Sequence, residues 1–224
     1  MITKLSIEFP IDPIVAQVKA MGYFDKSVIL NETNGKLLSG PYQTKEEFKG
    51  TPLGNVLDSL GNIGEARLLR LGSAESYTAH SDPDDRLHLA ITTNPYCYLI
   101  DFDNNINYHI PVDGRIYLMD TSYVHIAGNF GGRDRIHLNI RVPLPEFNYP
   151  GYRLGIRGGE FDWKQESYIV IMSFFNKAIK KRIITGFEKI NDKEVFINCN
   201  DLTLLSPYID KLKNKGFEVF LKET

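Results

Sequence analysis

Cysteine is scarce in this chain of 224 residues: it occurs only at Cys97 and Cys199. The two are far apart, each in an apolar stretch, and neither forms a CxxC pair or a zinc-finger spacing. A disulfide-rich secreted fold and a zinc-ribbon domain are therefore excluded. We interpret both cysteines as buried free thiols in a reducing compartment.

Long apolar runs and an excess of charge are also missing. No stretch approaches the roughly 18 apolar residues that a membrane helix needs. The start, MITKLSIEFPID, lacks the basic and apolar regions of a secretory signal. The net charge is −2 with a pI near 6.2, which gives no attraction to nucleic acid or anionic lipid. We expect a cytoplasmic protein with neither a membrane nor a nucleic-acid partner.

Short runs of strand-forming residues dominate the middle of the chain, and turn residues separate them. No helical pattern interrupts them, which is typical of an antiparallel sandwich or barrel. The sequence predicts eight strands, at 66–71, 75–80, 86–91, 96–101, 105–110, 114–119, 123–128 and 135–142.

The flanking segments differ from this central region. Helical spacing predicts short helices at 12–24 and 51–61, with polar loops at 30–53 between them. Pro, Gly and aromatic residues fill 146–166, which we interpret as a linker or lid after a first domain at 1–145 that comprises the N-terminal helical segment and the predicted strands. Alternating strand and helix patterns at 167–224 predict a small α/β domain with parallel pairing, a candidate for self-association or protein contact.

His80, Asp82 and His125 are the most informative residues. On an extended strand the first two side chains leave from the same side, and a second strand would bring His125 to them. Two imidazoles and one carboxylate form the ligand set of non-haem Fe(II) oxygenases, which leaves coordination positions open. Asp82 followed by Pro83-Asp84-Asp85 is also typical of an ordinary turn, so His80 and Asp82 taken alone would be weak evidence.

Two of the predicted strands alternate strictly between polar and apolar residues. Arg86 and His88 share one face of the first, and Arg135, His137, Asn139 and Arg141 share one face of the second. Such a face is either solvated or turned toward the interior to hold a charged ligand. Arg and His favour the second interpretation, because they suit fixed carboxylate recognition better than Lys and Glu do.

The stretch from about Glu65 to Val142 resembles the aspartyl/asparaginyl β-hydroxylase family of 2-oxoglutarate oxygenases and the related bacterial free-proline hydroxylases. The resemblance rests on EARLLRLGSAESYTAHSDPDDRLHLAI, on GRIYLMDTSYVH and on the arginine ten residues after its histidine. It implies a double-stranded β-helix, a jelly-roll or cupin-like fold. It also implies a dioxygenase that uses Fe(II), 2-oxoglutarate and O2, with ascorbate as reductant in vitro.

Carried over by residue, the resemblance assigns the metal to His80, Asp82 and His125. Arg135 would bind the distal carboxylate of 2-oxoglutarate, and Arg86 and His88 would line the pocket. The animal aspartyl hydroxylases have a glycine where this chain has Asp82, so this site is more similar to the free-amino-acid hydroxylases. The implied reaction hydroxylates a C–H bond of a free amino acid or of an amino-acid side chain in a peptide or protein.

Several alternatives stay open at this stage. Arg133 competes with Arg135 for the co-substrate, while His109 and His137 are interpreted as structural, His137 with a possible place in the pocket. The same residues would also suit a non-catalytic jelly-roll or cupin-type metal- or anion-binding module, or a zinc or manganese cupin enzyme. Segments 31–52 and 143–166, with Tyr42 and Trp163, are candidate substrate lids.

Overall fold

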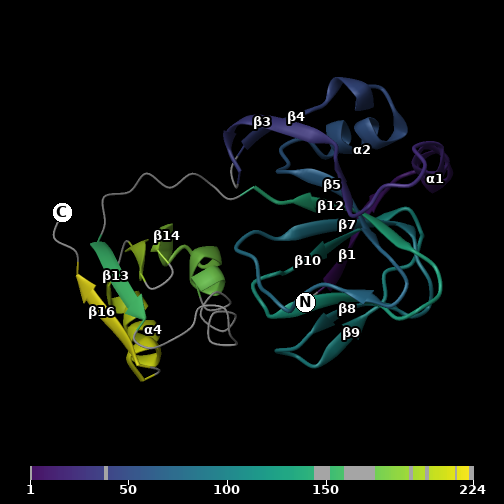
Figure 1. The fold of residues 1–224 in the computed structure, drawn as a ribbon. Coiled ribbons are helices and arrows are strands. Elements are labelled where there is room, and N and C mark those ends of the chain that lie inside the picture. The colour runs from purple at the N-terminus through teal and green to yellow at the C-terminus, as the bar shows by residue number, and fades with distance from the viewer. Residues whose placement is uncertain are drawn as a thin grey trace. The chain divides into compact units, whose positions relative to one another are not determined.

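The computed structural model describes residues 2–37, 40–143, 152–158, 175–191, 194–199, 202–214 and 216–221. The chain divides into two compact units. The first contains Met1–Ala79 and Asp84–Pro145, and the second contains His80–Pro83 and Glu146–Thr224. The protein is mainly β, with antiparallel pairing throughout the described strands (Figure 1).

Two antiparallel sheets form the first unit. The six-stranded sheet has the order β1-β10-β7-β12-β5-β2, and the four-stranded sheet has the order β6-β11-β8-β9. Neither sheet closes on itself among the described residues, so the barrel expectation is met only as open sheets. The strands are β1 (Ile2–Glu8), β2 (Ser27–Ile29), β5 (Ala66–Leu71), β6 (Glu75–Ser76), β7 (Arg86–Thr92), β8 (Cys97–Asp101), β9 (Ile106–Tyr108), β10 (Arg115–Met119), β11 (His125–Asn129) and β12 (Arg135–Arg141).

All eight strands predicted between residues 66 and 142 are confirmed, although β6 is much shorter than expected. Two edge strands, β1 and β2, were not predicted. Most side chains of Ile2–Glu8 are exposed, so this strand lacks the one-sided apolar pattern by which strands are found in a sequence. It is defined instead by its pairing with β10.

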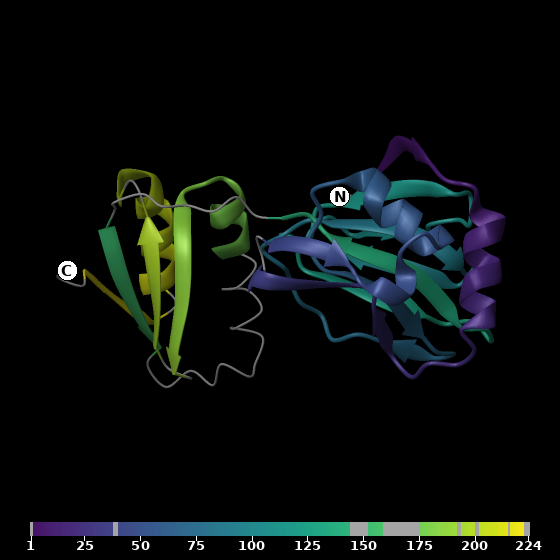
Figure 2. The ribbon, with the colours of Figure 1, turned by 90° about the horizontal axis from the view of Figure 1, so that it is seen from above.

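The two faces of the six-stranded sheet have different partners. On one face, Leu68, Leu89 and Leu138 belong to a core shared with helices α1 (Ile11–Ala20) and α2 (Pro52–Leu60). The opposite face shares a second core with the four-stranded sheet, which includes Leu71, Ala90, Leu99, Ile110, Tyr117, Met119 and Ala127. Figure 2 shows both helices beside the strands of this unit. The polar alternates of β7 and β12 therefore face the space between the sheets.

Local sequence explains the ends of α2. Thr51 accepts a hydrogen bond from the backbone N–H of Gly54, as an N-cap residue does, and Pro52 occupies the first turn. Gly61 ends the helix with a φ of 74°, a conformation that glycine adopts without steric cost. The helix predicted at 51–61 is confirmed, and the one predicted at 12–24 ends earlier, at Ala20.

The polar segment expected as loops at 30–53 contains regular structure, so that expectation was wrong. Strands β3 (Asn31–Lys36) and β4 (Gly40–Thr44) pair as a hairpin, followed by the short 3₁₀ helix η1 (Glu46–Phe48). The hairpin forms its own two-stranded sheet, so no buried face imposes apolar alternation on its sequence.

The second unit contains a four-stranded sheet of order β14-β15-β13-β16 and the helix α4 (Leu202–Asn214). Its strands are β13 (Tyr152–Gly158), β14 (Ile184–Asn191), β15 (Glu194–Cys199) and β16 (Phe217–Leu221). Every pair is antiparallel, which corrects the predicted parallel pairing. The unit has its own core, which includes Leu154, Ile156, Phe175, Leu205 and Leu212.

Two further expectations for this part of the chain need comment. Strand β13 lies within the segment interpreted as a linker or lid, and it pairs with both β15 and β16. The strand predicted at 168–174 lies outside the described residues. Within the described part of the chain, no helix has the length and apolar character that crossing a bilayer requires.

Candidate metal centre and its polar interior

His125 is the first residue of β11, and its side chain is 6% exposed. Alternation along the strand puts it on the same face as Ala127, which belongs to the core between the sheets. Its Nδ1 lies 2.9 Å from the carbonyl oxygen of Tyr123. A neutral imidazole that donates Nδ1–H to this carbonyl keeps the lone pair of Nε2 for a metal, the usual arrangement for a ligating histidine.

His80 and Asp82 lie beyond the end of β6, His80 at an isolated β-bridge and Asp82 outside any strand, rather than on the extended strand expected for them. The Nε2 atom of His80 is 3.6 Å from Oδ2 of Asp82. One nitrogen of each histidine and one carboxylate oxygen all lie within 4.8 Å of one another. The structure thus brings together the three residues that the sequence singled out.

This donor set fits a single divalent ion. Metal–ligand bonds of about 2.1 Å place the ligand atoms of one ion roughly 3 to 4.2 Å apart. A side-chain rotation that moves the ring of the exposed His80 by about an ångström would bring the three ligand atoms into this range. Two imidazoles and one carboxylate suit Fe(II) and leave positions for further ligands.

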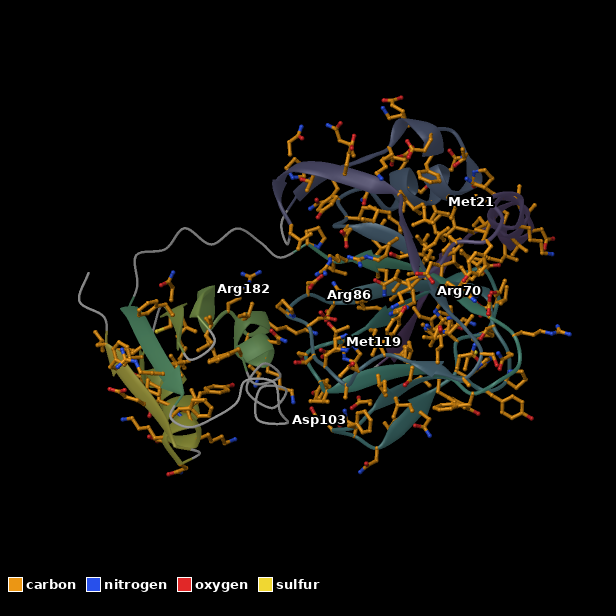
Figure 3. All side chains as sticks on the ribbon, viewed as in Figure 1. Met21, Arg70, Arg86, Asp103, Met119 and Arg182 are labelled. Carbon is orange, nitrogen blue, oxygen red and sulfur yellow. The ribbon has the colours of Figure 1, made fainter. Side chains whose placement is uncertain are left out.

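The polar residues of β7 and β12 are buried between the sheets, so the interior interpretation is the correct one. The strands pair with Arg86 opposite Arg141, His88 opposite Asn139 and Ala90 opposite His137. On the β7 side, Arg86 also pairs with Met119 of β10 (both labelled in Figure 3). The buried polar side chains of the two strands are Arg86, His88, Arg135, His137 and Asn139.

Arg135 is a buried cation without a counter-ion. Its side chain is 2% exposed, and no carboxylate of the described residues forms an ion pair with it. Burial lowers the pKa of Arg135 to about 10, still far above neutral pH, so the guanidinium remains charged. Arg133, the competing arginine, is exposed. Among the described residues the charge of Arg135 therefore has no compensating carboxylate, and an anionic ligand would neutralise it.

His88 and His137 lie beside this guanidinium, with ring centroids 5.8 Å apart. Burial, and then the charge of Arg135, hold the pKa of each well below 6.5, so both rings are neutral at pH 7. One ring nitrogen of each has no hydrogen-bond partner among the described residues: Nδ1 of His88 and Nε2 of His137. Sequence reasoning interpreted His137 as mainly structural, although its place on the polar face with Arg135 was visible.

Arg86 is engaged differently from what the resemblance implies. It pairs with Asp84, which is fully buried and also accepts hydrogen bonds from Arg141 at 2.9 and 3.1 Å. Glu65 pairs in turn with Arg67 and lies 3.6 Å from Nε of Arg141. We call Asp84, Arg86, Arg141, Glu65 and Arg67 the ion chain. Sequence reasoning missed Asp84, and the only signal was its place in an acidic turn.

Of the lid candidates, Tyr42 lies close enough to Arg67, Asp84 and Arg141 of the ion chain to interact with them electrostatically. The hydroxyl of Tyr42 donates to the carbonyl of Leu37 within the β3–β4 hairpin. A hollow of about 290 Å³ lies between this hairpin and α2, lined in part by Tyr42, Lys49 and Asp58. Trp163 lies outside the described residues.

A protein family and a solved structure are similar to parts of this chain. No curated protein sequence matches the chain. The crystal structure of an oxidoreductase of the 2OG-Fe(II) oxygenase family from Burkholderia pseudomallei is similar over 57% of this chain and 76% of that one, with 9% identity and a TM-score of 0.42. Residues 53–145 match the family model of aspartyl/asparaginyl β-hydroxylase, a stretch that includes all six predicted site residues. The resemblance seen in the sequence is thereby confirmed for this part of the chain.

Proposed function

We propose that this protein is an Fe(II)- and 2-oxoglutarate-dependent dioxygenase built on a double-stranded β-helix. Its substrate would be a free amino acid or an amino-acid side chain in a peptide or protein, hydroxylated at a C–H bond. The observation that carries the proposal is the buried, unpaired Arg135 in the same interior that His125 faces. The hydroxylase-family match over residues 53–145 supports it independently.

His80, Asp82 and His125 would hold the metal. The contact of His125 Nδ1 with the Tyr123 carbonyl fixes the ring that must ligate through Nε2. When bound, Fe(II) supplies the oxidising chemistry: with O2 it converts 2-oxoglutarate to succinate and carbon dioxide and inserts one oxygen atom into the substrate C–H bond.

Arg135 would bind the distal carboxylate of 2-oxoglutarate. A guanidinium grips a carboxylate with two parallel N–H donors, which fixes its orientation as well as its charge. His88 would add a further donor: the amide nitrogen of Asn139 lies 3.3 Å from its Nε2, so the ring proton sits on the unpartnered Nδ1. Arg86 is not assigned a co-substrate role, because Asp84 already neutralises it.

The apolar residues between the sheets complete the environment. Leu71, Leu99 and Met119 surround the polar face with a water-poor core. Exclusion of water strengthens the attraction between Arg135 and a bound carboxylate and protects reactive species from side reactions.

The proposal is tested by succinate formation. With Fe(II), 2-oxoglutarate and ascorbate, the protein is expected to release succinate, and turnover should rise with one member of a panel of the twenty amino acids and short peptides. His125→Ala should lose both metal binding and turnover, whereas His109→Ala, a change at an exposed histidine bonded to the Cys97 carbonyl, should keep both. Bound metal without turnover would point instead to a binding module, and turnover with zinc or manganese alone would point to another cupin reaction.

A further inference from the structure

The tautomer of His137 is fixed by its neighbour. Its Nδ1 lies 2.9 Å from a terminal guanidinium nitrogen of Arg135. A guanidinium can only donate hydrogen bonds, so Nδ1 must be the acceptor. A neutral imidazole carries a single proton, and that proton must therefore sit on Nε2.

This Nε2–H is a buried donor with nothing to donate to. His137 is 2% exposed, and its Nε2 has no hydrogen-bond partner among the described residues. Buried donors in folded proteins are almost always satisfied, because an unmade bond costs about 1–3 kcal/mol. The exception points to an acceptor that is not part of the protein.

The surroundings define the chemistry of that acceptor. His137 contacts Arg135, whose positive charge is unpaired, and packs edge-on against His88, whose Nδ1 is also unpartnered. Donors and positive charge gather here, and no carboxylate of the described residues pairs with Arg135. An anion with several acceptor oxygens supplies both the negative charge that Arg135 lacks and acceptors for unpartnered N–H groups, whereas a neutral ligand would leave the charge of Arg135 uncompensated.

We propose that His137 is a co-substrate-binding residue with two roles. Its Nδ1 orients the guanidinium of Arg135, and its Nε2–H donates to a carboxylate oxygen of the anion that Arg135 neutralises. This deepens the proposed function and rests on it, since 2-oxoglutarate would be the anion. It replaces the interpretation of His137 as mainly structural.

Binding measurements separate these roles from simple packing. We would titrate Mn(II)-loaded protein with 2-oxoglutarate and with succinate in the absence of O2, by calorimetry. His137→Leu should weaken binding of both by roughly 10- to 100-fold, the effect of losing one hydrogen bond to a charged group and the orientation of Arg135. His137→Gln should recover most of the affinity, because an amide offers both an acceptor and a donor. Mn(II) affinity should be unchanged in both, and His109→Leu serves as the matched control.

A second measurement needs no variant. In wild-type protein labelled with ¹⁵N at histidine, His137 should show the Nε2–H tautomer, and its Nε2 signal should shift when 2-oxoglutarate is added. This arm keeps the test decisive even if His137→Leu does not fold. The opposite tautomer, or an Nε2 signal indifferent to the ligand, overturns the proposal.

The outcomes distinguish the two proposals. If wild-type protein binds 2-oxoglutarate and His137→Leu binds it equally well, only the role of His137 is overturned. If wild-type protein binds neither dicarboxylate, both the role of His137 and the proposed function are overturned.

Discussion

The two ends of the polar face of β7 and β12 differ in whether a buried positive charge has a carboxylate beside it. At one end of the β7–β12 pair, Arg86 and Arg141 share the fully buried Asp84. At the other end, the buried Arg135 contacts the neutral His137 and has no carboxylate partner among the described residues. Breaking a buried ion pair costs several kcal/mol, whereas an unpaired buried charge already weakens the fold. The first end therefore holds its positive charge beside a buried carboxylate, and our proposal assigns the counter-ion of the second to a ligand.

The largest effect is expected at the compensated end. Asp84→Ala leaves Arg86 and Arg141 facing each other in the interior, so we expect the free energy of unfolding to fall by about 3–5 kcal/mol. Urea denaturation monitored by fluorescence would measure it. Asp58→Ala removes an exposed carboxylate that accepts a hydrogen bond from Thr44 and should change stability little. A similarly small loss at Asp84 would show that the two ends do not differ.

A substitution of Arg135 should reduce the affinity for 2-oxoglutarate more than it reduces the free energy of unfolding. Arg135→Met is expected to weaken 2-oxoglutarate binding about 100-fold, since a charge-assisted bidentate contact is lost. The free energy of unfolding should change by less than about 2 kcal/mol, because the variant no longer buries an unpaired charge. Calorimetry and urea denaturation would measure the two quantities. Arg133→Met, at the exposed arginine that lies two residues before β12, is the control. Unimpaired binding by Arg135→Met would contradict the assignment.

The neutral histidine beside Arg135 predicts a pH dependence. The pKa of His137 is held well below 6.5 in the folded state, mainly by burial, while the unfolded chain titrates near 6.5. Below about pH 6.5 the unfolded state binds a proton that the folded state does not. The contribution to stability is complete above that pH and is lost on acidification, by about 1.4 kcal/mol per pH unit, until the folded pKa is reached.

Residue 137 cannot titrate in the His137→Gln variant, so the stability of this variant should fall less steeply as the pH decreases below about 6.5. Unfolding curves of both proteins at several pH values would give the two slopes. Identical slopes would show that His137 is not kept neutral by the fold.

The smallest effect concerns a residue outside both ends of the polar face. Thr51 caps α2 through the N–H of Gly54, and Thr51→Ala should lower the free energy of unfolding by about 1 kcal/mol. Dicarboxylate affinity should not change, because α2 packs on the other face of the sheet. A loss of affinity in this variant would mean that modest destabilisation alone weakens dicarboxylate binding. Weaker binding by Arg135→Met would then no longer distinguish the two ends of the polar face.

Short-range patterns were enough to predict much of the first unit. The strict alternation in RLHLAI and RIHLNIRV identified β7 and β12 and assigned their polar faces correctly to the interior. The β3–β4 hairpin was missed because it forms a separate two-stranded sheet, so no buried face imposes an alternating apolar pattern on its sequence. The C-terminal pairing was predicted with the wrong direction, because strand direction depends on which segments meet, and β13 came from a stretch interpreted as a linker.

By itself, the sequence determined which side chains are candidates for the chemistry: two histidines and an aspartate with ligand character, and an arginine on an alternating strand. Residue type and period establish that much, because they are local properties of the chain. Only the tertiary structure decided how each charge is used. Arg86 and Arg135 look equivalent in the sequence, and burial beside Asp84 neutralises one while the other is buried beside neutral His137. Partners brought together by folding set the electrostatic energy of a buried group, and no local pattern records them.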